Sequence, residues 1–175
     1  MTNDEKIAHL WEVDRITKVM LQFGRALDLG DWAAYRECMT NPVTIEFTRL
    51  TGQPRARANP ADFAGFAEAI LSPVKRHHSF SNFHIELDGD RATAMIHMTA
   101  RHWKATDLGS SSNAQHGWYD VIFAKEADNW LISEIKHDFQ WIEGNGGLFD
   151  MTDPKLHEAM ARVFNPTTFE AAATD

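Results

Sequence analysis

A single cysteine, Cys38, is present among the 175 residues of the chain. One thiol cannot close an intramolecular disulfide or supply the several ligands of a thiolate metal cluster, so both are excluded. The chain also lacks any apolar run near the roughly 18 residues that a membrane-spanning helix needs. Its first residues, MTNDEKIAHLWEVD, have neither the basic nor the apolar region of a signal peptide. We therefore predict a soluble, cytoplasmic protein that does not enter a membrane.

Positive charge is also scarce, because 17 Lys and Arg residues face 25 Asp and Glu residues and leave a formal net charge of −8. Such a chain repels a phosphate backbone, so we predict no nucleic-acid partner. Apolar residues make up 43% of the sequence and aromatic residues 11%. A single domain of this length buries roughly 70% of its unfolded surface, and this apolar content is enough to fill a core and line a pocket.

Helical periodicity dominates the beginning of the sequence, and alternation of apolar and polar residues dominates its second half. Ile16, Met20 and Phe23 recur at helical spacing, and Gly30 supplies a stop signal. The predicted elements are helices at 4–28, 31–39 and 59–71, strands at 41–47, 83–87, 92–105, 116–126 and 130–143, and a short helix at 154–164.

Helices followed by a run of long antiparallel strands indicate an α+β fold rather than a parallel, doubly wound sheet. We expect residues 1–165 to form one domain with a pocket. Its sheet, antiparallel or mixed and strongly curved, should wrap around the long N-terminal helix as a cone-shaped barrel. Residues 48–60 and 106–113 are expected to be loops, and residues 166–175 a frayed tail.

Five of the nine histidines fall in the stretch RHHSFSNFHIELDGDRATAMIHMTARHW, residues 76–103. Side chains alternate between the two faces of a strand. In the strand at 92–105 the more apolar face carries Met98 and ends at His102, so His102 should point into the cavity. By the same alternation, His137 and Phe139 share the inward face of the last strand, and Tyr119 belongs to an inward row of the strand before it.

Asp28 ends the first helix, where the negative end of the helix dipole disfavours a carboxylate. It is therefore either an ordinary solvated turn residue or a carboxylate aimed into the cavity to orient a histidine. In the second case Asp28, His78, His102, Tyr119 and His137 could converge. An imidazole held by a carboxylate is a suitable general base near neutral pH. The alternative for each histidine is a hydrogen-bonded core residue without a catalytic role.

A metal site is the less favoured use of these histidines. The sequence has no HExxH motif, and His77 and His78 are adjacent, so along a strand they point to opposite faces. His78, His102 and His137 could meet as a three-histidine site, but we predict no bound metal.

Three segments, RALDLGDWAAYRECMTNPVTIEF, HHSFSNFHIELDGDRATA and NWLISEIKHDFQWIEGN, make the chain resemble the nuclear transport factor 2-like superfamily over roughly residues 5–145. The polyketide-cyclase-like (SnoaL-like) branch is the most similar. This branch includes scytalone dehydratase, bile-acid 7α-dehydratase and hexachlorocyclohexane dehydrochlorinase. The resemblance implies a lyase without a cofactor, a cone-shaped α+β barrel, and a homo-oligomer that is either a trimer or a dimer.

The resemblance also assigns roles to particular positions. Asp28 matches the carboxylate that those lyases pair with their catalytic histidine, and His78 matches that histidine. His102 falls where scytalone dehydratase has a second active-site histidine. The chain is therefore expected to contain the Asp-His dyad of the branch.

Two positions depart from the pattern of the branch. Phe47 stands where the dehydratases have a tyrosine, and Phe23 replaces a tyrosine or lysine that serves as the acid in two of these enzymes. Proton donation would then fall to Tyr119, His102 or His137. The residues expected to be catalytic are Asp28, His78, His102 and Tyr119, and those expected to contact the substrate are Phe23, Phe47, Met98, His137 and Phe139.

These predictions together favour a lyase. His78, oriented by Asp28, would abstract a proton from a small hydrophobic molecule, aromatic or alicyclic, and water, halide or a small carbonyl fragment such as formaldehyde would leave. Tyr119 and the cavity histidines would act as acid or oxyanion donors. One alternative is an isomerase or cyclase that uses the same base. Another is a non-catalytic binding or scaffold module similar to the β-subunits of ring-hydroxylating dioxygenases.

Overall fold

Capping residues fix both ends of the long first helix, α1 (Asn3–Leu29). The Thr2 hydroxyl accepts a hydrogen bond from the Glu5 amide, and the Glu5 carboxylate accepts one from the Thr2 amide, which makes a capping box. Gly30 ends the helix in the left-handed conformation, with φ of 72°, which glycine adopts easily because it has no Cβ. The predicted helix at 4–28 is therefore confirmed.

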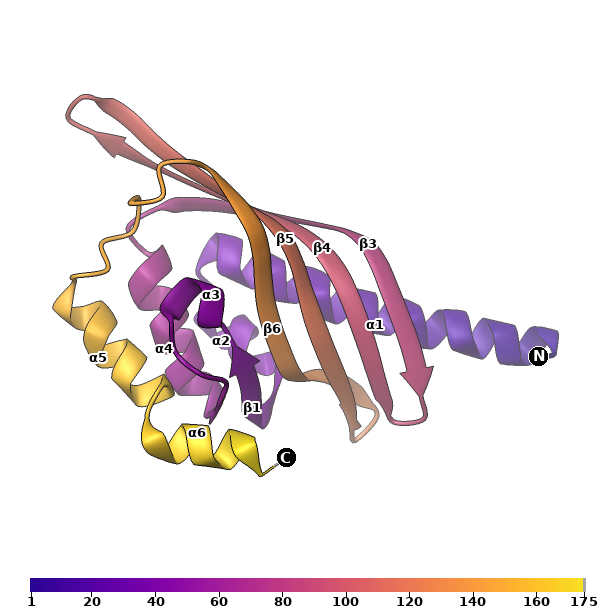
Figure 1. Cartoon of the computed structure of the whole chain (residues 1–175). Coiled ribbons are helices and arrows are strands. Elements are labelled where there is room, and N and C mark those ends of the chain that lie inside the picture. The colour runs from indigo at the N-terminus through magenta and orange to yellow at the C-terminus, as the bar shows by residue number, and fades with distance from the viewer. Residues whose placement is uncertain (175) are drawn as a thin grey trace.

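The computed structural model describes residues 1–174 and shows a helical first part followed by long strands (Figure 1). Within these residues, no helix is both long and apolar enough to cross a membrane. The elements after α1 are α2 (Trp32–Glu37), β1 (Met39–Glu46), α3 (Thr48–Thr51), β2 (Ala56–Ala58), α4 (Pro60–Leu71), β3 (Lys75–Asp88), β4 (Arg91–Thr106), β5 (Gly109–Glu126), β6 (Asn129–Gly144), α5 (Pro154–Val163) and α6 (Pro166–Ala173).

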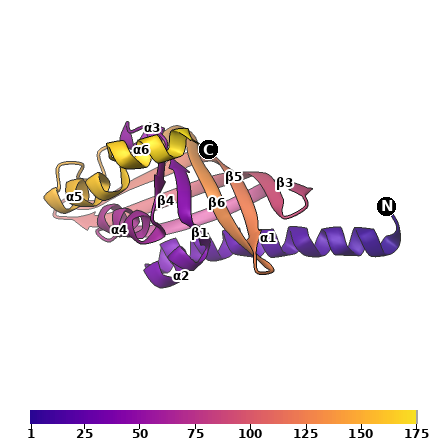
Figure 2. The same ribbon diagram turned by 90° about the horizontal axis from the view of Figure 1, so that it is seen from below.

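One mixed sheet of six strands forms the body of the fold, in the order β2-β1-β6-β5-β4-β3. β1 runs parallel to β6, and all other neighbouring strands are antiparallel. The sheet bends strongly and stays open, and α1 packs across it against β3 and β6 (Figure 1). Helices α2, α4, α5 and α6 gather at the end of the molecule far from the start of α1 (Figure 2). This architecture confirms the predicted α+β fold with a curved sheet around a long first helix.

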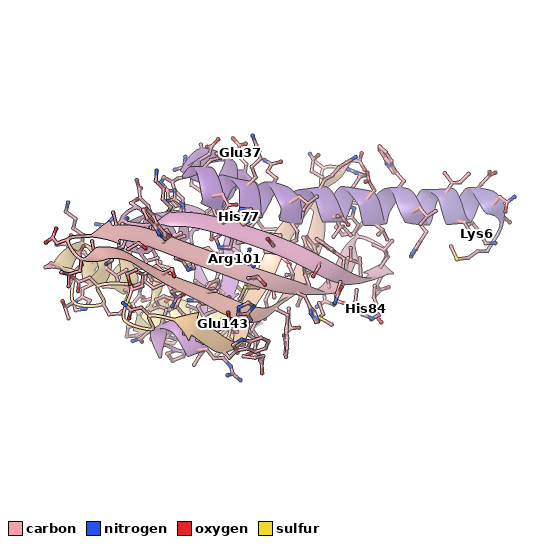
Figure 3. The ribbon with its side chains drawn as sticks, turned by 90° about the horizontal axis from the view of Figure 1, so that it is seen from above. Lys6, Glu37, His77, His84, Arg101 and Glu143 are labelled. Carbon is pink, nitrogen blue, oxygen red and sulfur yellow. The ribbon has the colours of Figure 1, made fainter. Side chains whose placement is uncertain are left out.

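The interior face of the sheet follows the predicted alternation. Tyr119 on β5 and His137 on β6 are buried, whereas His77 and Arg101 lie on the outer face (Figure 3). Because the side-chain period of a strand is two, a shift of one residue would turn all of these side chains to the other face. The buried row of β4 consists of Ala92, Ala94, Ile96, Met98, Ala100 and His102.

Two stretches that were expected to be loops contain regular structure. Residues 48–60 hold α3 and β2, and β2 pairs with β1. The stretch 106–113 is almost entirely strand, because β4 extends to Thr106 and β5 begins at Gly109. Its glycine and serines suggest a loop by composition, but they pair with residues 103–106 of β4 and continue the long β4–β5 ladder. Such pairing outweighs weak intrinsic preferences for strand.

The prediction of a frayed tail at 166–175 is wrong for residues 166–173, which form helix α6. The Asn165 side chain accepts a hydrogen bond from the Thr168 amide, and the Thr168 hydroxyl accepts one from the Asn165 amide. The helix packs against β2, and Arg55, the residue before β2, donates to the carbonyl of Ala172 at 2.8 Å. A cap and a tertiary contact therefore hold a segment whose composition alone suggests fraying; residue 175 lies outside the described residues.

Candidate active site

Asp28 and His78 form a direct hydrogen-bonded pair where α1 meets β3. The two side chains are joined by a distance of 2.7 Å between His78 Nδ1 and Asp28 Oδ1. The backbone amide of His78 also donates to both carboxylate oxygens of Asp28, at 3.0 and 3.1 Å. Asp28 is thus a carboxylate fixed to a histidine and not a freely solvated turn residue. The carboxylate accepts a hydrogen bond from Nδ1 of His78. In the neutral ring Nδ1 therefore carries the proton, and Nε2 has a free lone pair.

The two adjacent histidines differ strongly in their exposure. The His78 side chain is 4% exposed, whereas the His77 side chain is 67% exposed and its Nδ1 lies 3.7 Å from Asp28 Oδ2. Figure 3 shows His77 on the outer surface of the sheet. Only His78 therefore presents its ring to the interior.

Arg76 explains why α1 can end in a carboxylate. The last turn of α1 contains no basic residue of its own. The guanidinium of Arg76, two residues before His78 on β3, donates to the carbonyl of Leu27 and to that of Leu71, the latter at 2.9 Å. Burial lowers the pKa of Arg76, and the charge of Asp28 opposes that change. A cation supplied by β3 thus stabilises both the helix terminus and the carboxylate beside it.

His102 lies next to the dyad as a neutral imidazole. Its ring centroid is 5.9 Å from that of His78. Its Nδ1 lies 3.4 Å from Oδ1 of Asn113, and the amide of Asn113 in turn donates to the carbonyl of Asn145 at 3.1 Å. Burial and the neighbouring His78 lower the pKa of His102 to about 4. The arrangement makes Nδ1 of His102 a donor to Asn113 and leaves its Nε2 as an acceptor.

Tyr119 and His137 lie side by side further along the inner face. Their ring centroids are 5.2 Å apart, and Phe47 stacks on His137 at 5.1 Å. Burial, with smaller contributions from His78 and His102, lowers the pKa of His137 to about 3. Burial also raises the pKa of Tyr119 well above its usual range. At neutral pH both groups are therefore uncharged, and the hydroxyl of Tyr119 keeps its proton.

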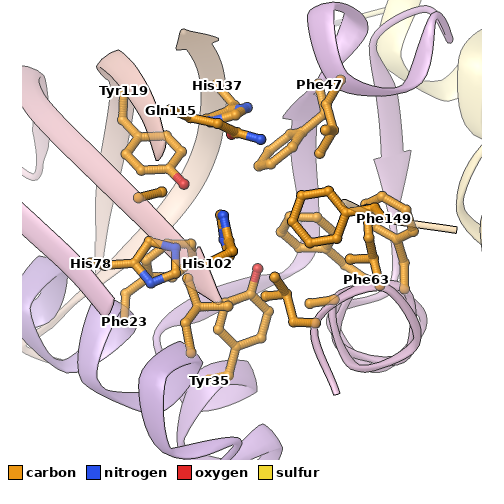
Figure 4. Close-up of a pocket in the computed structure, with 17 residues that line it drawn as sticks. Phe23, Tyr35, Phe47, Phe63, His78, His102, Gln115, Tyr119, His137 and Phe149 are labelled. Carbon is orange, nitrogen blue, oxygen red and sulfur yellow. The ribbon is translucent and has the colours of Figure 1, made fainter. Parts of the chain in front are cut away.

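These side chains border a cavity of about 60 Å³ that α1, α2, α4 and the sheet enclose (Figure 4). Among residues 1–174, the side chains that line it include no Lys, Arg, Asp or Glu. The cavity is therefore mostly apolar, with a few polar groups placed around it, as is usual for small-molecule sites. Its lining consists of Phe23, Leu27, Tyr35, Phe47, Leu50, Phe63, Phe66, Ala67, Ile70, Leu71, His78, Ala100, His102, Gln115, Tyr119, His137 and Phe149.

Most of the residues singled out from the sequence lie in this lining or touch it, but Met98 and Phe139 are not part of it. Met98 is buried in the same row as His102, but its partner on β3 is Phe80, which packs against Gly24 of α1. The space beside Met98 is therefore occupied by the packing of Phe80 against α1 and does not belong to the cavity. Phe139 contacts the ring of His137, with ring centroids 5.5 Å apart, and pairs with Gly117 just before a register shift between β5 and β6.

Two polar residues of the cavity were missed in the sequence. Tyr35 on α2 is fully buried, burial raises its pKa well above the usual range, and its hydroxyl points into the cavity (Figure 4). Gln115 was missed because the strand was expected to begin at residue 116. Its even spacing from Tyr119 on the same strand would have placed it on the inward face.

No group of three or more His, Cys, Asp or Glu residues within the described part of the chain could hold a metal ion. His78 and His102 each use Nδ1 for a hydrogen bond to another side chain, Asp28 and Asn113 respectively. Those bonds orient imidazoles whose Nε2 atoms are free to accept, which suits proton transfer.

The two buried neutral histidines should make the protein sensitive to mild acid. In the unfolded chain each histidine titrates near 6.5, whereas the native pKa of His102 is about 4 and that of His137 about 3. At a pH between the unfolded and the native pKa of a histidine, the unfolded chain binds more protons than the native protein. The free energy of unfolding therefore falls as the pH falls through this range. From pH 7 to pH 5 the expected loss is about 2 kcal/mol for each histidine, measurable by urea unfolding. A flat profile in the wild type, or an equal slope in His137→Phe, would contradict this assignment.

Comparison with known proteins relates the chain to a family. Residues 8–136 match the sequence model of the SnoaL-like domain. The solved structure of the Kfla4162 protein from Kribbella flavida is similar, with 26% sequence identity and a TM-score of 0.70, over 85% of this chain and 96% of that one. No curated protein matches the chain in sequence.

Two enzymes of known or assigned type share the fold at lower identity. Hexachlorocyclohexane dehydrochlorinase LinA-type3 from Novosphingobium barchaimii is 10% identical, with a TM-score of 0.67 over 83% of this chain and 98% of its own. A scytalone dehydratase candidate from Novosphingobium aromaticivorans is 13% identical, with a TM-score of 0.66 over 80% and 91% of the two chains. These likenesses establish the shared architecture.

Proposed function

Because the chain belongs to the SnoaL-like family, we propose that it is a lyase that works without a cofactor. Asp28 and His78 would abstract a proton, and water, halide or a small carbonyl fragment would leave from an apolar aromatic or alicyclic molecule. The observation that carries the proposal is the 2.7 Å hydrogen bond between Asp28 and His78 at the wall of an apolar cavity. Two of the similar structures are named as a dehydratase and a dehydrochlorinase, and both names describe elimination reactions, which supports elimination here.

In the proposed reaction the lone pair of His78 Nε2 takes a proton from carbon. The electron pair of the broken C–H bond ends in the new C=C bond, and the electron pair of the bond to the leaving group departs with that group. Asp28 stabilises the imidazolium that results and keeps the ring in the required tautomer. The dyad thus needs no other charged group inside the cavity to act as a base.

A hydroxide leaving group also needs a proton. Tyr35 and Tyr119 are the suitable donors, because their hydroxyls point into the cavity and burial, which raises the pKa of each, keeps both hydroxyls protonated until the leaving group departs (Figure 4). The phenolate formed would recover its proton from the imidazolium of His78. His102, predicted to be catalytic, would serve as a hydrogen-bond acceptor in this scheme, since its Nδ1–H is directed to Asn113.

The proposal can be tested by deuterium incorporation without knowledge of the natural substrate. Wild type and Asp28→Asn would be incubated in D₂O with a set of six-membered cyclic β-hydroxy ketones, and mass and ¹H NMR spectra would be followed. The lyase proposal expects conversion to the enone by loss of water, which is 18 mass units before any deuterium taken up is counted, about 100-fold faster in the wild type than in Asp28→Asn. Isomerisation, or deuterium exchange without loss of water, would assign the same base to an isomerase. Equal rates for the two proteins would contradict catalysis by the dyad.

The homo-oligomer, trimer or dimer, and the cytoplasmic location stay predictions from the sequence. The apolar lining and the absence of charged side chains among the described lining residues support a small hydrophobic substrate.

A further inference from the structure

Two polar side chains of the cavity, Gln115 and His137, have no part in the proposed proton transfer. They lie together across the cavity from His78 and Tyr35, beside Phe47 (Figure 4). Gln115 is 4% exposed and His137 is also 4% exposed. Polar groups buried this deeply normally have hydrogen-bond partners, so the two side chains call for an explanation.

The surroundings of His137 fix its tautomer. Nδ1 of His137 is buried and has no hydrogen-bond partner among residues 1–174. A buried N–H without an acceptor costs more than a buried lone pair without a donor. We therefore assign the proton to Nε2. Since the ring is neutral at physiological pH, with its pKa lowered to about 3, His137 offers the cavity one N–H donor and no charge.

Gln115 adds a second group of the same kind. It precedes Tyr119 by four residues on β5, so both side chains project from the inner face of the strand. Figure 4 shows its carboxamide nitrogen directed toward the space between His137 and Phe47. A carboxamide supplies N–H donors and can turn to present either end. Donors from two adjacent strands thus converge on one side of the cavity.

The opposite side of the cavity has the complementary character. Nε2 of His78 and Nε2 of His102 are both acceptors, because the Nδ1 atoms are bonded to Asp28 and Asn113. The cavity is therefore polarised, with acceptors near the dyad and donors near Gln115. An anionic group would find no cationic side chain in the described lining, and burial of an unpaired carboxylate is strongly unfavourable.

We propose that Gln115 and His137 form an oxygen-binding subsite for a neutral carbonyl group, so that the substrate is an uncharged cyclic ketone or aldehyde. This inference rests on the proposed function for the identity of the reacting bond, although the subsite itself does not. A carbonyl held there by two N–H donors would acidify the neighbouring C–H bonds and stabilise the enolate oxygen as a proton passes to His78. That gives an imidazole base a carbon acid it can deprotonate.

The test compares three probes of similar size and different polarity. Cyclohexanone carries the carbonyl, methylenecyclohexane replaces its oxygen by carbon, and cyclohexanecarboxylate adds a charge. Dissociation constants would be measured by NMR titration for the wild type, Gln115→Leu, His137→Phe and Asp28→Asn. The subsite predicts that the wild type binds the ketone about tenfold more tightly than the alkene, as expected for two buried hydrogen bonds, and binds the carboxylate most weakly.

The variants separate this inference from the proposed function. Gln115→Leu and His137→Phe should bring the ratio of ketone to alkene affinity close to one. Asp28→Asn should keep the wild-type ratio, since it removes the base and leaves the donors in place. Equal ketone and alkene affinity in the wild type, preference for the carboxylate, or binding of none of the probes would overturn the subsite.

A measurement on the wild type avoids dependence on the folding of the variants. In ¹⁵N-detected histidine spectra of the protein without a probe, His137 should show a protonated Nε2 and an unprotonated Nδ1. Saturating cyclohexanone should shift the Nε2 resonance of His137, whereas methylenecyclohexane should not. A protonated Nδ1, or an Nε2 signal that the ketone leaves unchanged, would overturn the assignment whatever the outcome of the exchange experiment with Asp28→Asn.

Discussion

His78→Gln is expected to lower the rate of proton abstraction about 1,000-fold, because the glutamine amide has no basic nitrogen at the position of Nε2. The rate would be followed as deuterium incorporation or as product formation at saturating substrate. His77→Gln is the matched control: it makes the same change one residue earlier, on a side chain that is 67% exposed on the outer face. It should leave the rate within a factor of two.

Substitution of Asp28 should also slow proton abstraction, but its effect should not add to that of His78→Gln. Asp28→Asn is expected to slow the reaction about 100-fold, since it removes the charge that stabilises the imidazolium. The double variant should be no slower than His78→Gln alone, because residues that act as one unit are not additive. A His78→Gln protein with wild-type activity, or an additive double variant, would contradict a dyad mechanism.

Gly117→Ala is expected to destabilise the protein by at least about 2 kcal/mol, as overpacking against rigid backbone does. A Cβ at this position would overlap the carbonyl oxygen of Asp138 and lie 2.5 Å from Cα of Phe139. Both obstacles are backbone atoms of β6, at a register shift between β5 and β6. The strands would have to separate beside Tyr119 and His137. Urea or thermal unfolding measures the loss.

Gly65→Ala provides a control of the opposite sign. Gly65 lies inside α4, and a Cβ added there meets no atom within 4 Å. Replacing a helical glycine by alanine usually stabilises a protein by about 0.5–1 kcal/mol. If the two substitutions changed the free energy of unfolding equally, the close approach at Gly117 would not be the cause.

Strand alternation made much of the site predictable. A period of two is enough to place His102, Tyr119 and His137 on the inner face once the strands are recognised. The position of Asp28 at the end of a helix was unfavourable by local electrostatics, and such a conflict often marks a functional residue. The side chain that resolves the conflict, Arg76, comes from a strand 48 residues later and could not be inferred from local pattern.

The missed features depend on contacts between distant parts of the chain. Gln115 follows a run of glycine and serines whose composition indicates a turn, yet the long ladder with β4 makes that run a strand. Tyr35 enters the cavity because α2 packs against α4, a contact that no periodicity in a six-residue helix reveals. The same holds for α6, which is ordered by its cap and by its packing on β2.

The tautomer of His78 is the most direct test of the dyad, because the proposed base must have a free Nε2. ¹⁵N and ¹H spectra of the histidine side chains, assigned with His78→Gln, report which ring nitrogen carries the proton. The account predicts that Nδ1 of His78 is protonated and strongly hydrogen-bonded, and that this signal is lost in Asp28→Asn. A proton on Nε2 in the wild type would contradict the central claim, since His78 could then accept no proton from a substrate in the cavity.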